Sequence, residues 1–227
     1  MKLSTLPLGV QNIVKTYEQA YSHEIQQGLD WYPNAYKIAL RMSQKYSVDI
    51  NQVVGVLAVI SPNNLWERNC IDAENILRIW ATFKDVDLKK ADKLDLVIIK
   101  RCIKLVKICT FNGNKDKAIK VLMIKNKVKA IKKIRKIIFG KVGFKVVEFM
   151  NSILGLDDCC IDGHAFSIHS GVRIPTTKTP AIGKKLRESI KNDYRLATKY
   201  INYDLGTKYK VSELQAITWV THKRIYS

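Results

Sequence analysis

Apolar residues recur along this chain at intervals of three and four, the spacing that places them on one face of an α-helix. The first such pattern runs from residue 9 to Gly28, where the glycine indicates an end. A second helix is predicted to open near Pro33 and run to Tyr46, and Asp49 is a suitable N-cap for a third helix through Ile60. Further helices are predicted over 66–83, 92–109, 115–124, 128–138, 145–154, 162–170, 183–203 and 211–223.

The alternation of apolar and polar residues that marks a half-buried strand is nowhere sustained, so we expect an all-α fold. The 227 residues suit one large domain or two small ones closely packed, and 47% apolar residues are enough for a core. The N-terminus has no long apolar region typical of a signal peptide, and no run approaches the roughly 18 apolar residues of a membrane span. We therefore expect a soluble, intracellular (cytoplasmic) protein that does not bind membranes.

The charge balance is strongly basic, with 39 Lys and Arg against 20 Asp and Glu, a net charge of +19. This excess predicts attraction to a polyanion, with nucleic acid first and an anionic membrane second. AT-rich coding explains part of the lysine count. It does not explain why residues 115–145 hold twelve basic residues and one acid, a pattern typical of a duplex-binding face or of a solvated helix face.

The five cysteines are odd in number, and no pair has CxxC spacing. Cys102 and Cys109 are seven apart and would share a helix face, while adjacent Cys159 and Cys160 are expected to pack. We therefore expect a reducing compartment, no structural disulfide, and no zinc or iron–sulfur site.

Candidate chemistry lies in Ile161-Asp162-Gly163-His164-Ala165-Phe166, where an acid is expected at the start of a helix. Lys145 lies seventeen positions upstream of Asp162. A lysine can be an amine nucleophile and an aspartate can stabilise positive charge or accept a proton, which suits chemistry at a nucleic-acid sugar. The other interpretations are a plain N-cap for Asp162, a packing or hydrogen-bonding role for His164, and an ordinary exposed lysine.

Two turns are candidate nucleic-acid contacts. Val142-Gly143-Phe144-Lys145 can offer backbone N–H groups to a DNA phosphate, or be an ordinary turn between helices. Ser61-Pro62-Asn63-Asn64 can place an amide where a base has left the duplex, or be a turn with a left-handed Asn. Trp66, Trp80 and Trp219 lie on amphipathic helices and are predicted to be core residues.

The order of these motifs resembles the helix-hairpin-helix (HhH-GPD) DNA glycosylases, and their endonuclease III-like branch most of all. The family hairpin Leu-Pro-Gly-Val-Gly-x-Lys is similar to residues 139–145, and the acid motif Val-Asp-Thr-His-Val to 161–165. The resemblance covers about residues 50–172, with the hairpin at 139–147. Residues 1–49 and 173–227 are expected to be flanking helices that form a second lobe of a single unit, 1–227. The segments 31–33 and 214–219 also resemble small phage proteins.

This resemblance implies a two-lobed fold in which double-stranded DNA binds across a central cleft and a base is flipped out. It makes Asp162 the essential acid and Lys145 the Schiff-base amine of members with lyase activity. It implies a monomeric DNA N-glycosylase for a damaged or modified base, without a cofactor. The residues it implies as DNA contacts are Asn63, Asn64, Lys141, Val142, Gly143 and His164.

Several positions depart from the family pattern. Lys141 replaces the first hairpin glycine and Gly140 the proline, so the turn is distorted or Lys141 adds a phosphate contact. Gly163 replaces Thr, Ser167 stands where Arg is common, and the C-terminal cysteine cluster is missing, so no iron–sulfur cluster is expected. Two alternatives are a base-modification enzyme acting on hypermodified pyrimidines in viral DNA and a catalytically silent DNA-binding module.

Overall fold

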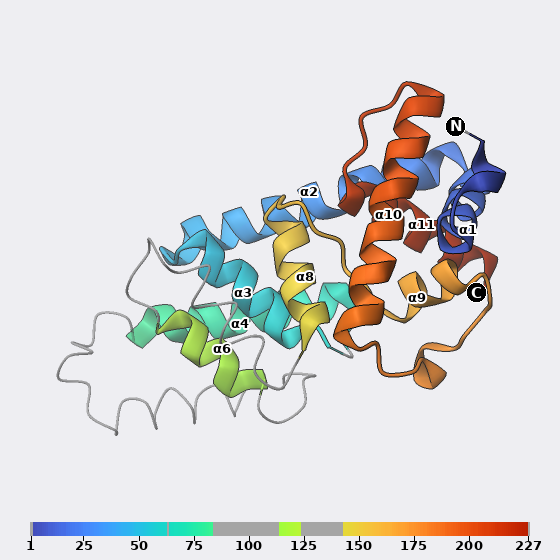
Figure 1. Cartoon of the computed structure of the whole chain (residues 1–227). Helices are drawn as coiled ribbons and strands as arrows, with labels where there is room; N and C mark the ends of the chain where they lie inside the picture. The colour runs from blue at the N-terminus through green and yellow to red at the C-terminus, as the bar shows by residue number, and fades with distance from the viewer. Residues whose placement is uncertain (1, 63, 84–113, 124–142, 227) are drawn as a thin grey trace. The chain divides into compact units, whose positions relative to one another are not determined.

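The computed structural model describes residues 2–62, 64–83, 114–123 and 143–226, and every regular element in these ranges is a helix (Figure 1). The predicted all-α fold class is confirmed. The predicted helices at 92–109 and 128–138 lie outside the described residues, as do Cys102 and Cys109. The elements are η1 (Leu3–Thr5), α1 (Leu8–Glu18), α2 (Ser22–Tyr46), α3 (Ile50–Ile60), α4 (Trp66–Phe83), α6 (Asn114–Leu122), α8 (Phe144–Ile153), α9 (Gly163–Ser170), η3 (Thr176–Lys178), α10 (Lys184–Leu205) and α11 (Val211–Ile225).

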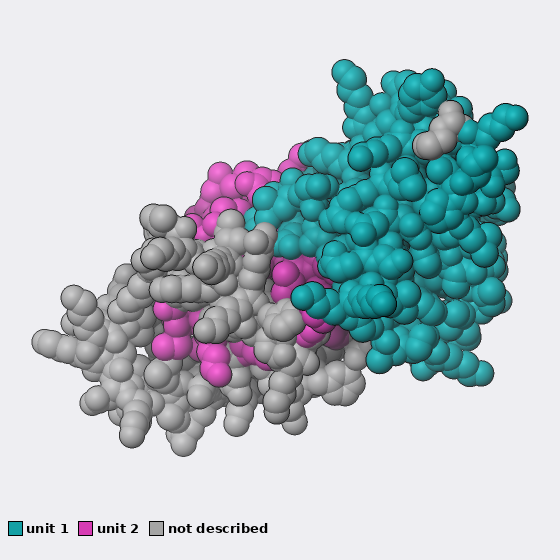
Figure 2. Space-filling model, viewed as in Figure 1, with its two compact units in different colours: residues 1–34, 151–227 teal, residues 35–150 magenta. Residues whose placement is uncertain are grey.

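The chain divides into two compact units (Figure 2). Unit 1 comprises Met1–Asn34 and Asn151–Ser227, and unit 2 comprises Ala35–Met150. Helices α2 and α8 each contribute residues to both units. The division into a glycosylase core and a flanking lobe stays a prediction.

Unit 1 is built on α1, which packs against α9, α10 and α11 (Figure 1). Its inward positions Val10, Ile13, Val14 and Tyr17 have the predicted helical spacing and are all buried. They meet apolar residues from the three partner helices, which removes a continuous apolar surface from water. The partners are Ala165, Ile168, Ile190, Tyr194, Ala197, Ile201, Val211, Leu214 and Ile217.

Unit 2 centres on α3, which contacts α4 and α6. Residues 52–60 of α3 are all buried, as expected of a helix that is apolar on every side. Asp49 caps it as predicted, because its carboxylate accepts a hydrogen bond from the Asn51 N–H at 3.0 Å. Gln52 donates to the carbonyls of Val121 and Leu122, the last residues of α6, and so supplies hydrogen bonds at the end of that helix.

The predicted break at Gly28 is wrong, because α2 runs without interruption from Ser22 to Tyr46 and contains both Gly28 and Pro33. A Cβ atom on Gly28 would lie 2.5 Å from the backbone Cα of Ile217 in α11. Glycine therefore serves close packing of two helices here and not helix termination.

The chain breaks instead between α1 and α2, at residues 19–21. Glu24 stabilises the new start, because its Oε2 accepts a hydrogen bond from the Tyr21 N–H at 2.9 Å. Arg224 of α11 pairs with the same carboxylate at 2.6 Å and holds the pKa of Glu24 below its usual value, mainly by hydrogen bonding. The start of α2 is thus stabilised by a residue two hundred positions away from Glu24.

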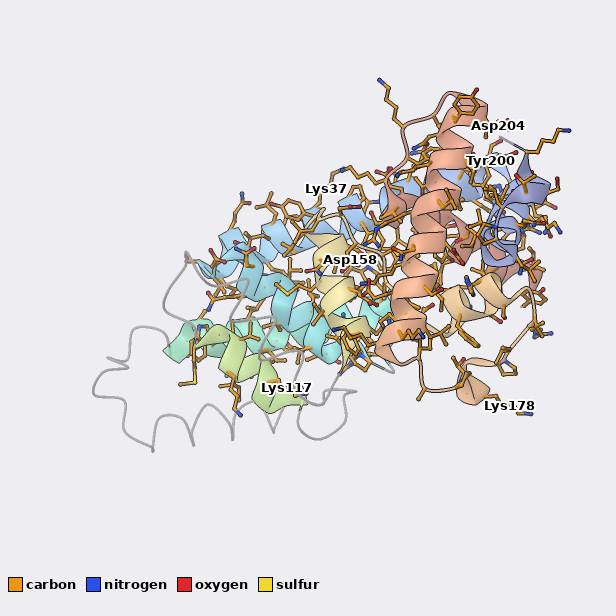
Figure 3. All side chains as sticks on the ribbon, viewed as in Figure 1. Lys37, Lys117, Asp158, Lys178, Tyr200 and Asp204 are labelled. Atoms are coloured by element: carbon orange, nitrogen blue, oxygen red, sulfur yellow. The ribbon has the colours of Figure 1, made fainter. Side chains whose placement is uncertain are left out.

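The positive charge of the described residues is spread over several elements. Lys37 in α2, Lys117 in α6 and Lys178 in η3 are examples from separate parts of the chain (Figure 3). Most of the basic segment 115–145 lies outside the described residues. Among the described helices, none has the length and apolar character needed to cross a bilayer.

Candidate functional site at the start of α9

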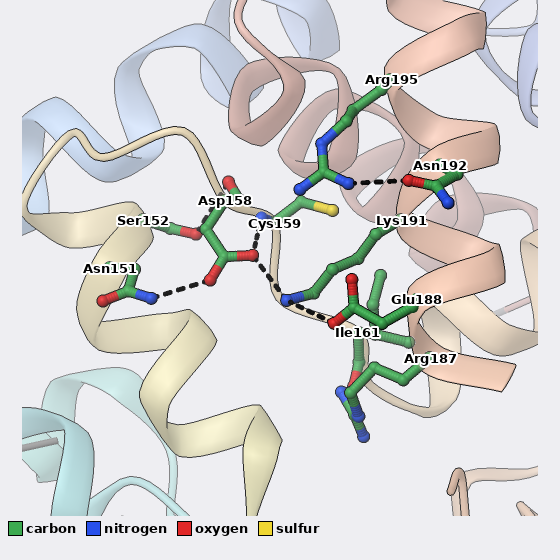
Figure 4. A network of polar contacts seen from close by, with 10 residues as sticks. All are labelled: Asn151, Ser152, Asp158, Cys159, Ile161, Arg187, Glu188, Lys191, Asn192 and Arg195. Carbon is green, nitrogen blue, oxygen red and sulfur yellow. Dashed lines mark hydrogen bonds and ion pairs between the residues drawn. The ribbon is translucent and has the colours of Figure 1, made fainter. Parts of the chain in front are cut away.

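The loop that leads into α9 is held by a buried polar network centred on Asp158 (Figure 4). Lys191 of α10 pairs with Oδ1 at 2.7 Å, and the Cys159 N–H donates to the same oxygen at 2.9 Å. Asn151, in the last turn of α8, donates to Oδ2 at 2.8 Å. Both carboxylate oxygens thus have donors, which offsets the cost of burying the charge.

The other end of the loop is held by Arg187, four residues before Lys191 on α10. Its guanidinium donates to the carbonyl of Ile161 at 2.7 Å, and both groups are buried (Figure 4). Ile161 directly precedes Asp162, so α10 fixes the backbone on which the candidate acid stands.

Asp162 begins α9 as predicted. Its backbone is extended, with φ −112° and ψ −169°, and its Oδ1 accepts a hydrogen bond from the Ala165 N–H at 2.9 Å. This is the geometry of an N-cap. The side chain is half-buried, and among the described residues no group donates to its second oxygen, Oδ2. One oxygen therefore supports the helix while the other remains available for a ligand.

His164 forms a close pair with His222 of α11. Their Nδ1 atoms lie 3.2 Å apart, so one imidazole donates its hydrogen and the other accepts it. Burial is the main cause that lowers the pKa of His222 to about 4; His164 and Arg173 act in the same direction, and Asp162 opposes them. His222 is thus neutral near pH 7, and the electrostatic effect of Asp162 on it indicates that the carboxylate lies near the pair.

Aromatic rings adjoin this pair. Trp219 meets His164 edge-on, with ring centroids 6.2 Å apart, and meets Trp31 of α2 at the same distance. Tyr32 is buried and donates to Gln215 at 2.9 Å; burial raises its pKa well above the usual value. The start of α9 therefore lies among aromatic rings and the imidazoles of His164 and His222.

The hairpin candidates belong to unit 2. Gly143 has φ +85°, a left-handed conformation that favours glycine, and directly precedes α8. Lys145 is exposed in the first turn of α8. Lys141 and Val142 lie outside the described residues. Lys145 and Asp162 fall in different units, and their meeting in one site stays a prediction.

The Asn turn also belongs to unit 2. Asn64 donates to Asp72 Oδ2 at 3.1 Å and is half-buried, while Asn63 lies outside the described residues. The Asn64 amide is engaged within its own unit, so insertion into a duplex would require it to exchange this hydrogen bond. The role of Asn64 in DNA binding stays a prediction.

Comparison with known families matches residues 4–225 to a family of unknown function (DUF7178). The chain belongs to this family. No curated protein and no solved structure matches it.

Sequence reasoning missed Asp158, Arg187, Lys191 and His222 in this DUF7178 member. One signal was available for two of them: Arg187 and Lys191 lie at helical spacing with Tyr194, on the face of α10 that packs inward. A basic residue at a core-facing position predicts a buried acceptor. Within the described ranges no three His, Cys, Asp or Glu side chains are grouped so that they could hold a metal ion.

Proposed function

We propose that this protein is a DNA N-glycosylase that flips a damaged or modified base out of the duplex and releases it. The observation that carries the proposal is Asp162, a half-buried carboxylate with one oxygen fixed by the Ala165 N–H and the other without a donor among the described residues. The motif order of the chain and its net charge of +19 add support.

Asp162 would act on the sugar of the flipped nucleotide. As the N-glycosidic bond breaks, its electron pair leaves with the base, which takes up a proton, and positive charge develops on the sugar. A carboxylate in a partly dry site stabilises that charge more strongly than one in water. Water then forms the new bond to C1′, so the products are a free base and an abasic sugar.

Lys145 would determine whether strand cleavage follows. An amine that attacks C1′ in place of water displaces the base and forms an imine with the opened sugar, and β-elimination then expels the 3′ phosphate. Support comes from its exposure in the first turn of α8, next to the left-handed turn at Gly143. Helix starts favour anions, so a phosphate near Gly143 would bring the sugar toward this amine.

The decisive variant is Asp162→Asn, because asparagine is as good an N-cap as aspartate and preserves the helix start. We expect base release to fall by about 10²–10⁴-fold while duplex binding is retained. The measurement is mass spectrometry of free bases released from genomic DNAs that differ in modification status. Asp157→Asn, an exposed acid in the same loop, is the matched control and should leave release unchanged.

Lys145→Ala is tested on the same substrates by strand nicking and by borohydride trapping of the imine. We expect nicking and trapping to be lost while base release persists. Lys120→Ala, an exposed lysine of α6 in the same unit, should retain both activities. Nicking that survives Lys145→Ala would remove this lysine from the mechanism.

A catalytically silent DNA-binding module is the second candidate, and the hydrogen bond from Ala165 to Asp162 favours it, because a purely structural cap makes the same bond. This candidate predicts duplex binding without release of any base. A base-modification enzyme is separated from both by altered nucleosides in the digested DNA. Asp162→Asn activity equal to wild type would exclude the proposed role of this residue.

A further inference from the structure

Helix α11 carries aromatic and basic residues at helical spacing along one side. Trp219 is followed three and four positions later by His222 and Lys223, and each of these is three or four positions before Tyr226. Their side chains therefore lie along one stripe that ends just beyond the helix. The rings of His222 and Tyr226 have centroids 4.6 Å apart, and His164 joins the row at 5.2 Å from His222. We call Trp219, Lys223, Tyr226 and the adjoining Arg173 the α11 face.

Two cations lie over the two outer rings of this face. The Lys223 ammonium is 4.5 Å from the centroid of Trp219, and the Arg173 guanidinium is 5.3 Å from that of Tyr226. Arg173 also donates to the Tyr226 carbonyl at 2.9 Å, which fixes its position beside the ring. Such cation–π pairs keep positive charge at the ring surface.

The face is accessible to a ligand. Lys223 and Arg173 are exposed, and Tyr226 is 37% exposed. Trp219 is half-buried, whereas Trp80 of unit 2 is only 7% exposed. Trp31 and His164 meet Trp219 at steep angles of 54° and 82° and do not stack on it in parallel. The Lys223 ammonium lies over the Trp219 ring at the end of a long side chain, and a stacking ligand would take its place there.

The charge of the α11 face selects an anionic ligand. Lys223 and Arg173 place two positive charges at the surfaces of its rings, and the acid Glu24 of α2 is paired with Arg224. Flat rings alternating with cations match a nucleotide strand, in which flat bases alternate with phosphates. An acidic peptide would satisfy the cations but would leave the ring surfaces without flat partners.

We infer that the α11 face binds an unpaired nucleotide, with the base stacked on Trp219 or Tyr226 and the phosphate held by Lys223 and Arg173. The face adjoins Asp162 through the pair His164–His222. The inference rests on the nucleic-acid partner of the proposed function and adds a contact that recognises an extrahelical base. It does not require that Asp162 be catalytic.

The test compares a labelled duplex carrying one bulged 2-aminopurine with its fully paired counterpart, by fluorescence anisotropy. Wild type should prefer the bulged duplex and quench the 2-aminopurine, since stacking on an aromatic ring quenches it. Trp219→Ala should reduce this preference by about tenfold. Trp219→Phe, which keeps a ring, should restore most of it. Tyr203→Ala, an aromatic residue of α10 that is 81% exposed, is the matched control and should change nothing.

Two further sets of variants test the α11 face independently of Trp219 and of base release. Tyr226→Ala, at the exposed end of the stripe, should lower the preference even if Trp219→Ala does not fold. Each variant is also made with Asp162→Asn, so that base release cannot alter the ligand. A preference for the bulged duplex in Asp162→Asn supports the α11 face. If wild type in addition releases no base from any substrate, the glycosylase is overturned while the α11 face stands.

The inference is overturned if Trp219→Ala and Tyr226→Ala, both folded by circular dichroism, bind bulged and paired duplexes as wild type does. It is also overturned if poly-glutamate, an acidic peptide, displaces the bulged duplex from the protein as effectively as single-stranded DNA does. In that case the face selects negative charge alone.

Discussion

At the scale of single residues, His222 is a group whose environment sets its charge. It is buried against His164, and both its burial and the neighbouring imidazole disfavour protonation of His222. Its pKa of about 4 in the folded protein compares with an ordinary value of 6.5. The imidazole therefore accepts a proton more readily in the unfolded chain than in the folded one.

This difference gives a pH dependence of known sign. The stability contributed by neutral His222 is complete above pH 6.5 and is lost as pH falls toward 4, because the unfolded chain binds the proton first. The resulting decrease in the free energy of unfolding should reach up to about 3 kcal/mol. His222→Asn retains a group that can hydrogen-bond His164 but does not titrate, so its melting temperature should fall less over this range.

Thermal unfolding at a series of pH values measures the effect. His23→Asn, an exposed histidine at the start of α2, is the control and should keep the wild-type profile. Parallel profiles for wild type and His222→Asn would show that the pair does not govern acid stability.

At the scale of elements, α10 positions the loop before α9 through two basic residues. Lys191 and Arg187 lie one turn apart and bind the loop at Asp158 and Ile161. An ammonium with 9% of its side chain exposed, paired to a carboxylate with 12% exposed, is a buried ion pair. Removal of one partner would leave the other charge buried without its counter-ion.

We therefore expect Lys191→Met to lower the free energy of unfolding by about 3 kcal/mol, the lower end for a broken buried pair because Asp158 keeps other donors. Urea unfolding measures this. Lys199 is an exposed lysine of the same helix, and Lys199→Met should lower the free energy of unfolding only slightly. Adding Asp158→Asn to Lys191→Met should recover part of the loss. A loss within about 1 kcal/mol, as for surface pairs, would mean that the pair is solvated.

Helix α2 shows how an element can differ from its local signals. Gly28 is a signal for a helix end and Pro33 was a signal for a helix start, yet both lie inside a helix of 25 residues. The close approach of Ile217 explains the glycine. Burial of Tyr32, Ala35 and Ala39 around the proline provides packing that offsets the hydrogen bond that proline cannot make.

At the scale of the whole molecule, the charge of +19 is the property on which the proposed association with nucleic acid depends. Binding to duplex DNA should weaken by about 10³-fold or more between about 50 and 200 mM salt if six or more phosphates are contacted. Anisotropy titrations at several salt concentrations give the slope. A slope near zero would show that the basic excess is not directed at nucleic acid. This measurement tests the partner and not the catalysis.

The sequence by itself determined the helices whose signals are local. The α4 bounds, the apolar face of α1, and the capping roles of Asp49 and Asp162 were all predicted. Each depends on residues within about one turn of one another, and such contacts are encoded by spacing alone.

The tertiary structure alone decided the rest. His164 meets His222 from 58 positions away, Arg187 reaches Ile161 from 26, and Ile217 makes Gly28 necessary inside a helix. These contacts depend on which helix faces pack together, and helical periodicity shows that a face is buried without naming its partner. For the same reason, spacing could identify Asp162 as a candidate acid but could not reveal the imidazoles and rings beside it.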